Sequence, residues 1–450
     1  MASTFFGLTI AYSGLQAANT SLTITGHNVS NINTKGYTKQ QAGTQAADAL
    51  RTHTTYGAIG SGVVVTEISQ IRDSYYDVKY RNNMANYGQY SVKESYMGQI
   101  EDYLDEFTLN GYSQEYKNFF SAVNQLTITP GDTSAKNQLI NNAKSLADYF
   151  NTLTTNLRNV QADANNEIKD AVQQINSYAK NIAALNRQIN QIEANYGNAN
   201  DLRDKRNAMI DELSEIVNLE TSEEDMGNNV SNFSVRINGQ TLVSSYSYNT
   251  LETVARTDKK NYSDAEGLYD VQWNSGQKFD MYSTSLSGHL KGLIDIRDGN
   301  NGEHENIETD DDGNNVTDSD GNLVLTTAPA ADKTVSYKGV PYYQAQLNEF
   351  AKIFSDAVNK IMKSGYTSDG SSKGISLFVT QPNTTVMSAG NITVNPQLLK
   401  NADLLAIKKE QNDGESDAKI MEELNKLQSE KIFACGTDNG LFHATEYRCA

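Results

Sequence analysis

Cysteine and proline are both scarce in this sequence of 450 residues. Its 2 cysteines, Cys435 and Cys449, lie near the carboxyl end. Neither a disulfide framework nor a zinc cluster can therefore hold the body of the chain together. Proline occurs 5 times. Because proline is the residue that most often interrupts helix interiors, this scarcity permits unusually long helices.

Long apolar runs and an excess of positive charge are also missing. No apolar run reaches the roughly 18 residues that a membrane-spanning helix needs. The 55 acidic and 37 basic residues give a net charge of −18, so binding nucleic acid would release few counterions. Residues 1–20 lack the basic and apolar regions of a cleaved secretory signal. We therefore expect no nucleic-acid partner and no membrane insertion.

The amino-terminal thirty residues carry apolar or small side chains at alternating steps of three and four, which predicts one face of a helix. These positions are Leu8, Ala11, Leu15, Ala18, Leu22, Thr25 and Val29. Lys35, Lys39 and Asp48 are the only charged residues among the first fifty. A solvated surface helix normally has charges opposite its apolar face. The pattern therefore favours a helix that other subunits surround over one docked only on its own core.

The longest periodic pattern extends from Leu139 to Ile192 in steps of four and three. One extra step of four, between Ala164 and Ile168, is a stutter that a coiled coil tolerates. A helix from Lys136 to Gln191 would be roughly 85 Å long, too long for one compact domain. Hydrophobic residues make up only 38% of the chain, which is typical of a protein with a large surface. Both observations predict an elongated molecule.

Two further helices have the same spacing, and a β-rich segment separates them. Residues 202–216 follow a short loop, which makes them an antiparallel neighbour of the long helix. Residues 347–361 form the second. In between, 233–237 and 240–243 flank Asn238-Gly239, a hairpin turn. The predicted fold is mainly α, multidomain and elongated, with long antiparallel coiled-coil-like helices and an inserted β-rich domain.

These patterns predict four regions. They are an amino-terminal assembly helix with its motif (1–50), a helical domain with short β segments (51–220 plus 341–433), an inserted β-rich outer domain (221–340) and an atypical tail (434–450).

Motifs that carry catalysis or bind metals are not found. The sequence has no nucleophile elbow, P-loop or dinucleotide fingerprint, and its 5 histidines are scattered. Asp310-Asp311-Asp312-Gly313 resembles half a calcium loop, but Ser319 stands where the bidentate glutamate belongs. His304-Glu305 lacks the second histidine of a zinc protease. We expect no enzyme, no cofactor and no metal site, although a buried acid–base pair stays open.

Residues 26–40, Gly-His-Asn-Val-Ser-Asn-Ile-Asn-Thr-Lys-Gly-Tyr-Thr-Lys-Gln, carry asparagines before an Asn-Thr-Lys-Gly-Tyr string. We call this segment the signature turn. It resembles the NNxxNxNTxGY motif of the bacterial flagellar rod, hook and hook-associated axial proteins. Residues 200–219, 287–298 and 394–405 are similar to the hook–filament junction members of that family. The resemblance covers the chain to about Phe433.

The resemblance implies a secreted structural protein of the extracellular flagellum, exported by the flagellar type III apparatus and joining hook to filament. Its implied partners are further copies in a ring, the hook protein, a second junction protein next to the filament and an export chaperone. The expected assembly interface comprises Leu8, Leu15, Ala18, Leu22, Val29, Asn28, Asn31, Asn33, Gly36 and Tyr37. The asparagines are expected to bond backbone in the turn, and Gly36 to take a conformation that other residues resist.

Junction members of the family end in a long heptad helix that pairs with the amino-terminal helix. Residues 434–450 show no heptad, which leaves two alternatives open: a natural tail, or a truncation or frame change in the sequence. Two alternative functions use the inserted domain: a flagellar-surface adhesin, or a carbohydrate-acting hydrolase. Two facing carboxylates in a cleft of 221–340 would favour the hydrolase.

Overall fold

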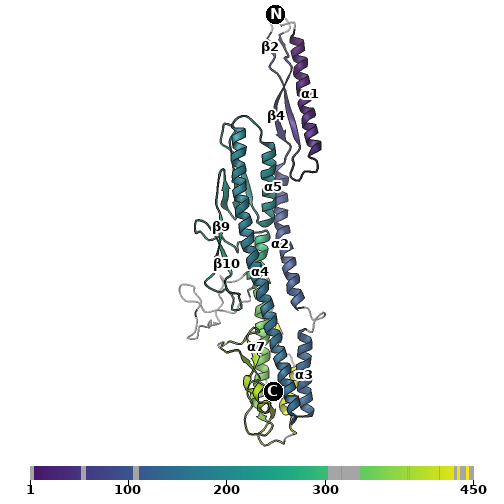
Figure 1. Ribbon diagram of the computed structural model, residues 1–450, viewed down its shortest axis with the longest axis vertical. Coiled ribbons are helices and arrows are strands. Elements are labelled where there is room, and N and C mark those ends of the chain that lie inside the picture. The colour runs from purple at the N-terminus through teal and green to yellow at the C-terminus, as the bar shows by residue number, and fades with distance from the viewer. Residues whose placement is uncertain are drawn as a thin grey trace. The chain divides into compact units, whose positions relative to one another are not determined.

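The computed structural model describes residues 5–51, 57–104, 111–302, 316, 335–382, 384, 386–414, 416–429, 433–435 and 442–444. Over these residues the chain is mainly α-helical, with small sheets, as the sequence predicts (Figure 1). His304, the acidic run 310–313, Ser319 and Cys449 lie outside the described residues.

The chain divides into two compact units. Unit 1 comprises Met1–Ser91, Asp170–Thr253 and Val271–Lys291, and unit 2 comprises Val92–Lys169, Val254–Asp270 and Gly292–Ala450. Helices α2 (Ser74–Leu104) and α4 (Thr133–Glu193) contribute residues to both. The predicted division into four regions stays a prediction.

Helix α4 has 61 residues, which corresponds to about 90 Å of continuous helix. It begins where the sequence offers a cap, since Oδ1 of Asp132 accepts a hydrogen bond from the Ser134 N–H at 2.8 Å. Every predicted apolar position from Leu139 to Ile189 is buried except Tyr178, and Ile192 is exposed. The pattern of threes and fours therefore located both the helix and its buried face.

The first part of unit 1 is a helix beside a hairpin. Helix α1 (Phe6–Ser30) contacts strands β1 (Gln40–Ala46) and β4 (Val63–Gln70). The strands pair antiparallel, with a bulge between Gly43 and Thr44. We call α1 with this hairpin the arm. The short strands β2 (Leu50–Arg51) and β3 (Ala58–Ile59) extend it.

The rest of unit 1 joins helix α5 (Asn200–Ile216) to a four-stranded antiparallel sheet. Its strands are β5 (Glu220–Asp225), β6 (Ser231–Ile237), β7 (Gln240–Ser244) and β8 (Ser247–Tyr248). Asn238 and Gly239 have φ of 49° and 76°, which confirms the predicted hairpin turn between β6 and β7. Strands β9 (Leu251–Ala255) and β10 (Tyr269–Trp273) form a separate pair.

Unit 2 is built around an aromatic core. Helices α3 (Tyr112–Ile128), α7 (Val340–Ser364) and α9 (Lys419–Leu427) and the first half of α4 enclose it. Phe119, Phe150 and Phe354 are buried there. The smaller elements are α6 (His289–Asp298), β11 (Tyr366–Thr367), β12 (Phe378–Thr380), β13 (Ile392–Val394), α8 (Pro396–Lys400), a 3₁₀ turn (Ala402–Leu404), β14 (Ala406–Lys408), β15 (Phe433–Cys435) and β16 (Phe442–Ala444).

Candidate assembly surface

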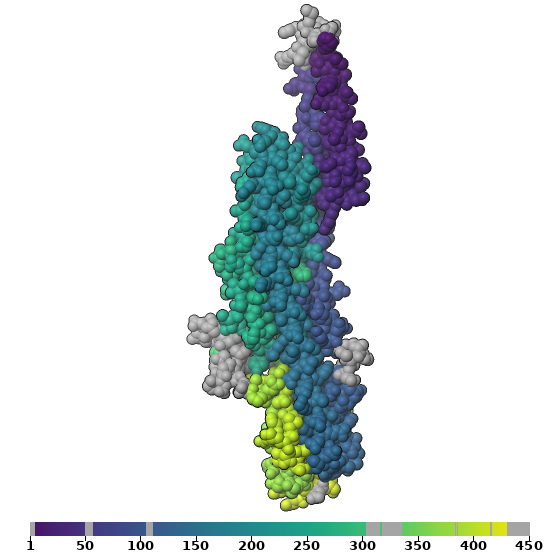
Figure 2. Space-filling model, in the orientation of Figure 1, coloured from purple at the N-terminus to yellow at the C-terminus, as the bar shows by residue number. Residues whose placement is uncertain are grey.

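The predicted apolar face of α1 points away from the hairpin that the helix contacts. Leu8, Leu15, Leu22 and Val29, which we call the outer stripe, are 66%, 60%, 70% and 66% exposed. Ala18, between them, is exposed as well. The helix instead buries Ala17 and Ile24. Figure 2 shows α1 in purple as an open surface along its whole length.

Two polar contacts fix α1 to the hairpin, one near each end. The Val63 N–H donates to Oγ of Ser13 at 3.2 Å, and Gly62 is so close to Ser13 that a Cβ would clash with its hydroxyl. At the other end, Nδ2 of Asn28 donates to the Gln40 carbonyl, and the Gln40 N–H donates to Oδ1 of Asn28, both at 2.9 Å. The Asn28 side-chain amide thus makes the two backbone hydrogen bonds that a neighbouring strand would otherwise make with Gln40, at the start of β1.

The signature turn closes on Asn28 through Tyr37. The Tyr37 hydroxyl donates to Oδ1 of Asn28 at 2.8 Å and lies 3.0 Å from Nδ1 of His27. Burial, and then the charges of Asp201 and Asp204, raise the pKa of the Tyr37 hydroxyl, so it stays a donor.

Two further residues of the expected interface shape the same turn. Nδ2 of Asn31 donates to the His27 carbonyl at 3.0 Å, as expected of a residue at the helix end, and Asn33 is exposed. Gly36 has φ of +82°, which confirms its expected conformation. A Cβ at Gly36 would also lie 3.0 Å from the Cβ of Ala208, so the turn approaches α5 closely.

Helix α5 receives the signature turn on one polar face. Asp204 accepts the Thr38 N–H at 3.0 Å and Nε2 of Gln70 at 2.8 Å. Asp201 accepts Nε2 of Gln40 at 3.1 Å. The structure therefore brings together two stretches, 26–40 and 200–219, that sequence analysis noted separately. The available signal was the spacing of Asp201, Asp204, Ala208 and Asp211, which places them on one helix face.

On the opposite face of α5, the side chains of two arginines make the packing contacts. Arg206 lies with its guanidinium 3.7 Å from the Phe233 ring centre and donates to Glu223 at 3.3 Å. Burial lowers the pKa of Arg206 to about 10, which leaves it charged at neutral pH. Arg203 donates to Glu193 at 2.7 Å, and this hydrogen bond raises the pKa of Arg203. These contacts hold α5 against α4 and the strands β5 and β6.

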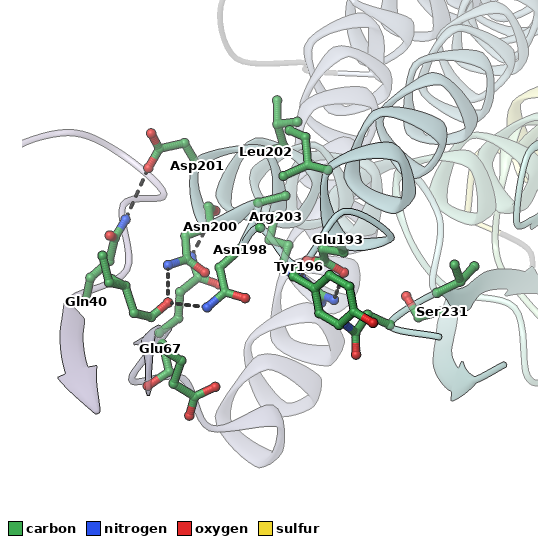
Figure 3. Close-up of a pocket in the computed structure, with 18 of the residues that line it drawn as sticks. Gln40, Glu67, Glu193, Tyr196, Asn198, Asn200, Asp201, Leu202, Arg203 and Ser231 are labelled. Atoms are coloured by element: carbon green, nitrogen blue, oxygen red, sulfur yellow. Dashed lines mark hydrogen bonds and ion pairs between the residues drawn. The ribbon is translucent and has the colours of Figure 1, made fainter. Parts of the chain in front are cut away.

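An open cleft of 1410 Å³ lies between the arm, the α4–α5 turn and the β5–β6 connection. Figure 3 shows Gln40 reaching Asp201 on one side of it and Ser231 on the other. Tyr196 is 90% exposed at its rim, with φ of 60°. Glu193, one of the carboxylates that line the cleft, is paired with Arg203.

Helix α2 has a second exposed aromatic surface, which the sequence analysis did not identify. Its tyrosines Tyr75, Tyr76, Tyr80, Tyr87 and Tyr90 are all exposed. The available signal was the spacing of four of them, at 76, 80, 87 and 90, which follows a helix face.

A buried charged cluster in unit 2 bears on the hydrolase alternative. Asp298 accepts Arg297 at 2.6 Å and Arg256 at 2.7 Å. Although burial raises the pKa of Asp298, these two arginines hold it well below the usual range. Burial and the charge of Asp298 raise the pKa of Asp264, which accepts a hydrogen bond from Gln161 at 2.8 Å.

Two carboxylates with opposed pKa shifts are typical of acid–base catalysis, but this pair has no room for a substrate. The hollow beside Asp264 measures 20 Å³, which is about the space of one water molecule. In the part of 221–340 that the structure describes, this cluster is structural.

Among the described residues, no helix combines the length and the apolar character needed to cross a membrane. The same residues also contain no group of three or more His, Cys, Asp or Glu side chains placed to hold a metal ion.

Comparison with known proteins identifies relatives over most of the chain. Flagellar hook-associated protein 1 of Bacillus subtilis is 27% identical over 390 residues, 83% of this chain and 70% of that protein. Its counterpart in Salmonella typhimurium is 33% identical over 219 residues, 48% of this chain and 39% of that protein.

The fold has a solved counterpart. The flagellar hook junction protein FlgK of Burkholderia pseudomallei matches with a TM-score of 0.50 and 23% identity, over 67% of this chain and 46% of that one. A family model described as the flagellar hook-associated protein FlgK helical domain matches residues 97–378, more than half of the chain. The chain belongs to the flagellar hook-associated protein FlgK family.

Proposed function

We propose that this protein is a structural subunit of the bacterial flagellum, which joins hook to filament by packing helices between subunits. The observation that carries the proposal is the outer stripe. Helix α1 has 25 residues without Asp, Glu, Lys or Arg, in a chain in which 20% of residues are charged. An apolar and uncharged helix surface of this length is typical of a protein interface.

The free energy that burial of the outer stripe can supply suits assembly by many subunits. Complete burial of one leucine side chain contributes about 1.5–3 kcal/mol. The three leucines of the stripe together offer about 4.5–9 kcal/mol, which is comparable to the 4–15 kcal/mol lost when two molecules associate. One contact is therefore weak, whereas a ring in which each copy contacts several others is stable. The exposed tyrosines of α2 offer a further aromatic surface for such contacts.

The finer architecture is part of the proposal. The buried positions of α4 recur in steps of three and four, and a short turn connects α4 to α5. Both features support antiparallel, coiled-coil-like packing in an elongated subunit. The β-rich insertion would then face outward, away from the assembly helices.

Membership of the family supports a proposal for the partners and the location. We propose that copies of this chain form a ring between the hook protein and a second junction protein next to the filament, after export from the cell with a chaperone. The interface would include the outer stripe and Ala18, with the signature-turn residues Asn28, Asn31, Asn33, Gly36 and Tyr37 fixing the direction of α1.

Co-assembly onto purified hooks tests this function. Replacing Leu8, Leu15 and Leu22 with serine should leave the monomer folded and abolish co-assembly, because the stripe no longer gains from burial. A matched control replaces Ile128 and Leu399, exposed residues of unit 2, with serine and should assemble normally. Unchanged co-assembly of the leucine variant would refute the proposal.

A further inference from the structure

One buried carboxylate of α5 meets both sides of the hairpin at its base. Asp204 is 7% exposed and accepts two hydrogen bonds, one from each side. Its Oδ2 takes the Thr38 backbone N–H at 3.0 Å, just before β1 begins. Its Oδ1 takes Nε2 of Gln70 at 2.8 Å, where β4 ends. One side chain therefore holds both strands at the base of the hairpin.

The chemistry of this contact requires a carboxylate. Both groups that meet Asp204 are donors, and an ionised carboxylate is an acceptor at both oxygens. An amide of the same shape offers one acceptor and one NH₂. It would place a donor against Nε2 of Gln70, which cannot turn away without losing its second hydrogen bond, to the Asn200 carbonyl at 3.0 Å. Hydrogen bonds to a charged acceptor are also stronger than those to a neutral one.

The other contacts between the arm and α5 each reach one side of the hairpin. Asn200 meets β4 alone: its Nδ2 donates to the Ile68 carbonyl at 2.7 Å, and its own carbonyl accepts Nε2 of Gln70 at 3.0 Å. Asp201 accepts only from the Gln40 side chain, at 3.1 Å, and is itself exposed. The ion pair between Lys35 and Glu212 is 3.4 Å long, and its side chains are 84% and 46% exposed. Exposed pairs of this kind contribute little.

We infer that Asp204 is a positioning residue for assembly: it sets the direction of the arm, and hence of the outer stripe, by accepting from both strands of the hairpin. This inference rests on the proposed assembly role of the outer stripe. Among the described residues of α5, Asp204 is the one that accepts hydrogen bonds from both sides of the hairpin.

The arm direction is measurable in the monomer by the distance between spin labels at Gln45 of β1 and Lys180 of α4. Both residues are exposed, and the labels require Cys435 and Cys449 to be replaced with serine. We expect one narrow distance distribution in the otherwise unchanged protein. Asp204→Asn should broaden it, with the ratio of docked to undocked arm falling about tenfold, as for the loss of one charged hydrogen bond.

Matched variants separate positioning from general destabilisation. Asp201→Asn, on the same helix face, should leave the distribution narrow. Gln70→Glu alone opposes two acceptors and should broaden it, whereas combining it with Asp204→Asn restores a donor–acceptor pair and should recover part of the narrow population. If Asp204→Asn fails to fold, Gln70→Ala removes one donor only and should broaden the distribution to a smaller degree.

Three results would overturn the inference. They are a narrow distribution in Asp204→Asn, a double variant as broad as either single one, and normal hook co-assembly by a variant with a broadened arm. The distance is measured in the monomer, without hooks. It therefore tests the role of Asp204 even if the unchanged protein fails to assemble, and that failure would refute the proposed function alone.

Discussion

Replacing Asp298 with asparagine should destabilise unit 2 far more than replacing Asp270, although both carboxylates contact the same arginine. Arg256 donates to Asp298 at 2.7 Å and to Asp270 at 2.6 Å. The difference lies in burial. The Asp298 and Arg297 side chains are fully buried, whereas that of Asp270 is 52% exposed.

The expected magnitudes follow from that burial. Removing one partner of a buried ion pair leaves an uncompensated charge and costs about 3–5 kcal/mol. With Asp298 neutral, Arg256 and Arg297 would both lose their shared carboxylate. An exposed ion pair contributes about 0–1 kcal/mol, so Asp270→Asn should change the free energy of unfolding by no more than that.

Hydrogen exchange at the backbone amides of α7 measures the opening free energy of unit 2 directly. Hydrogen exchange at the backbone amides of α5 follows unit 1 as an internal control. If Asp298→Asn lowers the opening free energy of unit 2 by no more than Asp270→Asn does, the reasoning is refuted.

The pH dependence provides a second test of the same pair. The pKa of Asp298 is lower in the folded protein than in the unfolded chain, where it is about 3.9. Its stabilising contribution is therefore complete above the unfolded pKa and is lost as pH falls toward the folded pKa. The difference in free energy of unfolding between wild type and Asp298→Asn should be constant around neutral pH and should shrink below about pH 4.

Two further predictions concern unit 1 and helix α2. Gly88→Ala should lower the free energy of unfolding in urea by about 1–3 kcal/mol, because the added Cβ would overlap the Glu215 carbonyl oxygen. Gly98→Ala, in the same helix, has open space and should raise it by about 0.5–1 kcal/mol. Equal effects of the two substitutions would contradict this packing. Tyr37→Phe removes the donor to Asn28 and should cost about 0.5–1.5 kcal/mol. The pKa of Tyr37 is raised in the folded protein. The difference in free energy of unfolding between wild type and Tyr37→Phe should therefore persist up to the unfolded pKa of about 10 and fall at higher pH. A difference that grows above that pH would contradict the hydrogen bond from Tyr37 to Asn28.

The sequence predicted the elements with long, regular patterns. Helix α4 follows from its apolar steps alone, and α1 follows from the same rule over a shorter stretch. The outward direction of the α1 stripe was favoured because charge is missing from that helix. Local rules of this kind suffice because side chains three and four positions apart share a helix face.

The contacts that position the site were not predictable in the same way. Thr38 and Asp204 are 166 positions apart, and their hydrogen bond uses a backbone N–H that no side-chain pattern records. Arg297 and Asp298 resemble ordinary charges at a helix end, yet both are buried, and Arg297 donates to Asn165 of α4 and to the Tyr269 carbonyl of β10. Burial of this kind depends on which distant segment covers the residue.

The central claim is that sister subunits cover the outer stripe, and thiol labelling at Leu22→Cys tests it most directly. In a background with serine at positions 435 and 449, the account predicts rapid labelling of the monomer, since Leu22 is 70% exposed, and strong protection once the protein has assembled on hooks. A cysteine at the exposed residue Asn249 of unit 1 is the control and should label equally in both states. Equal labelling of position 22 before and after assembly would contradict the account.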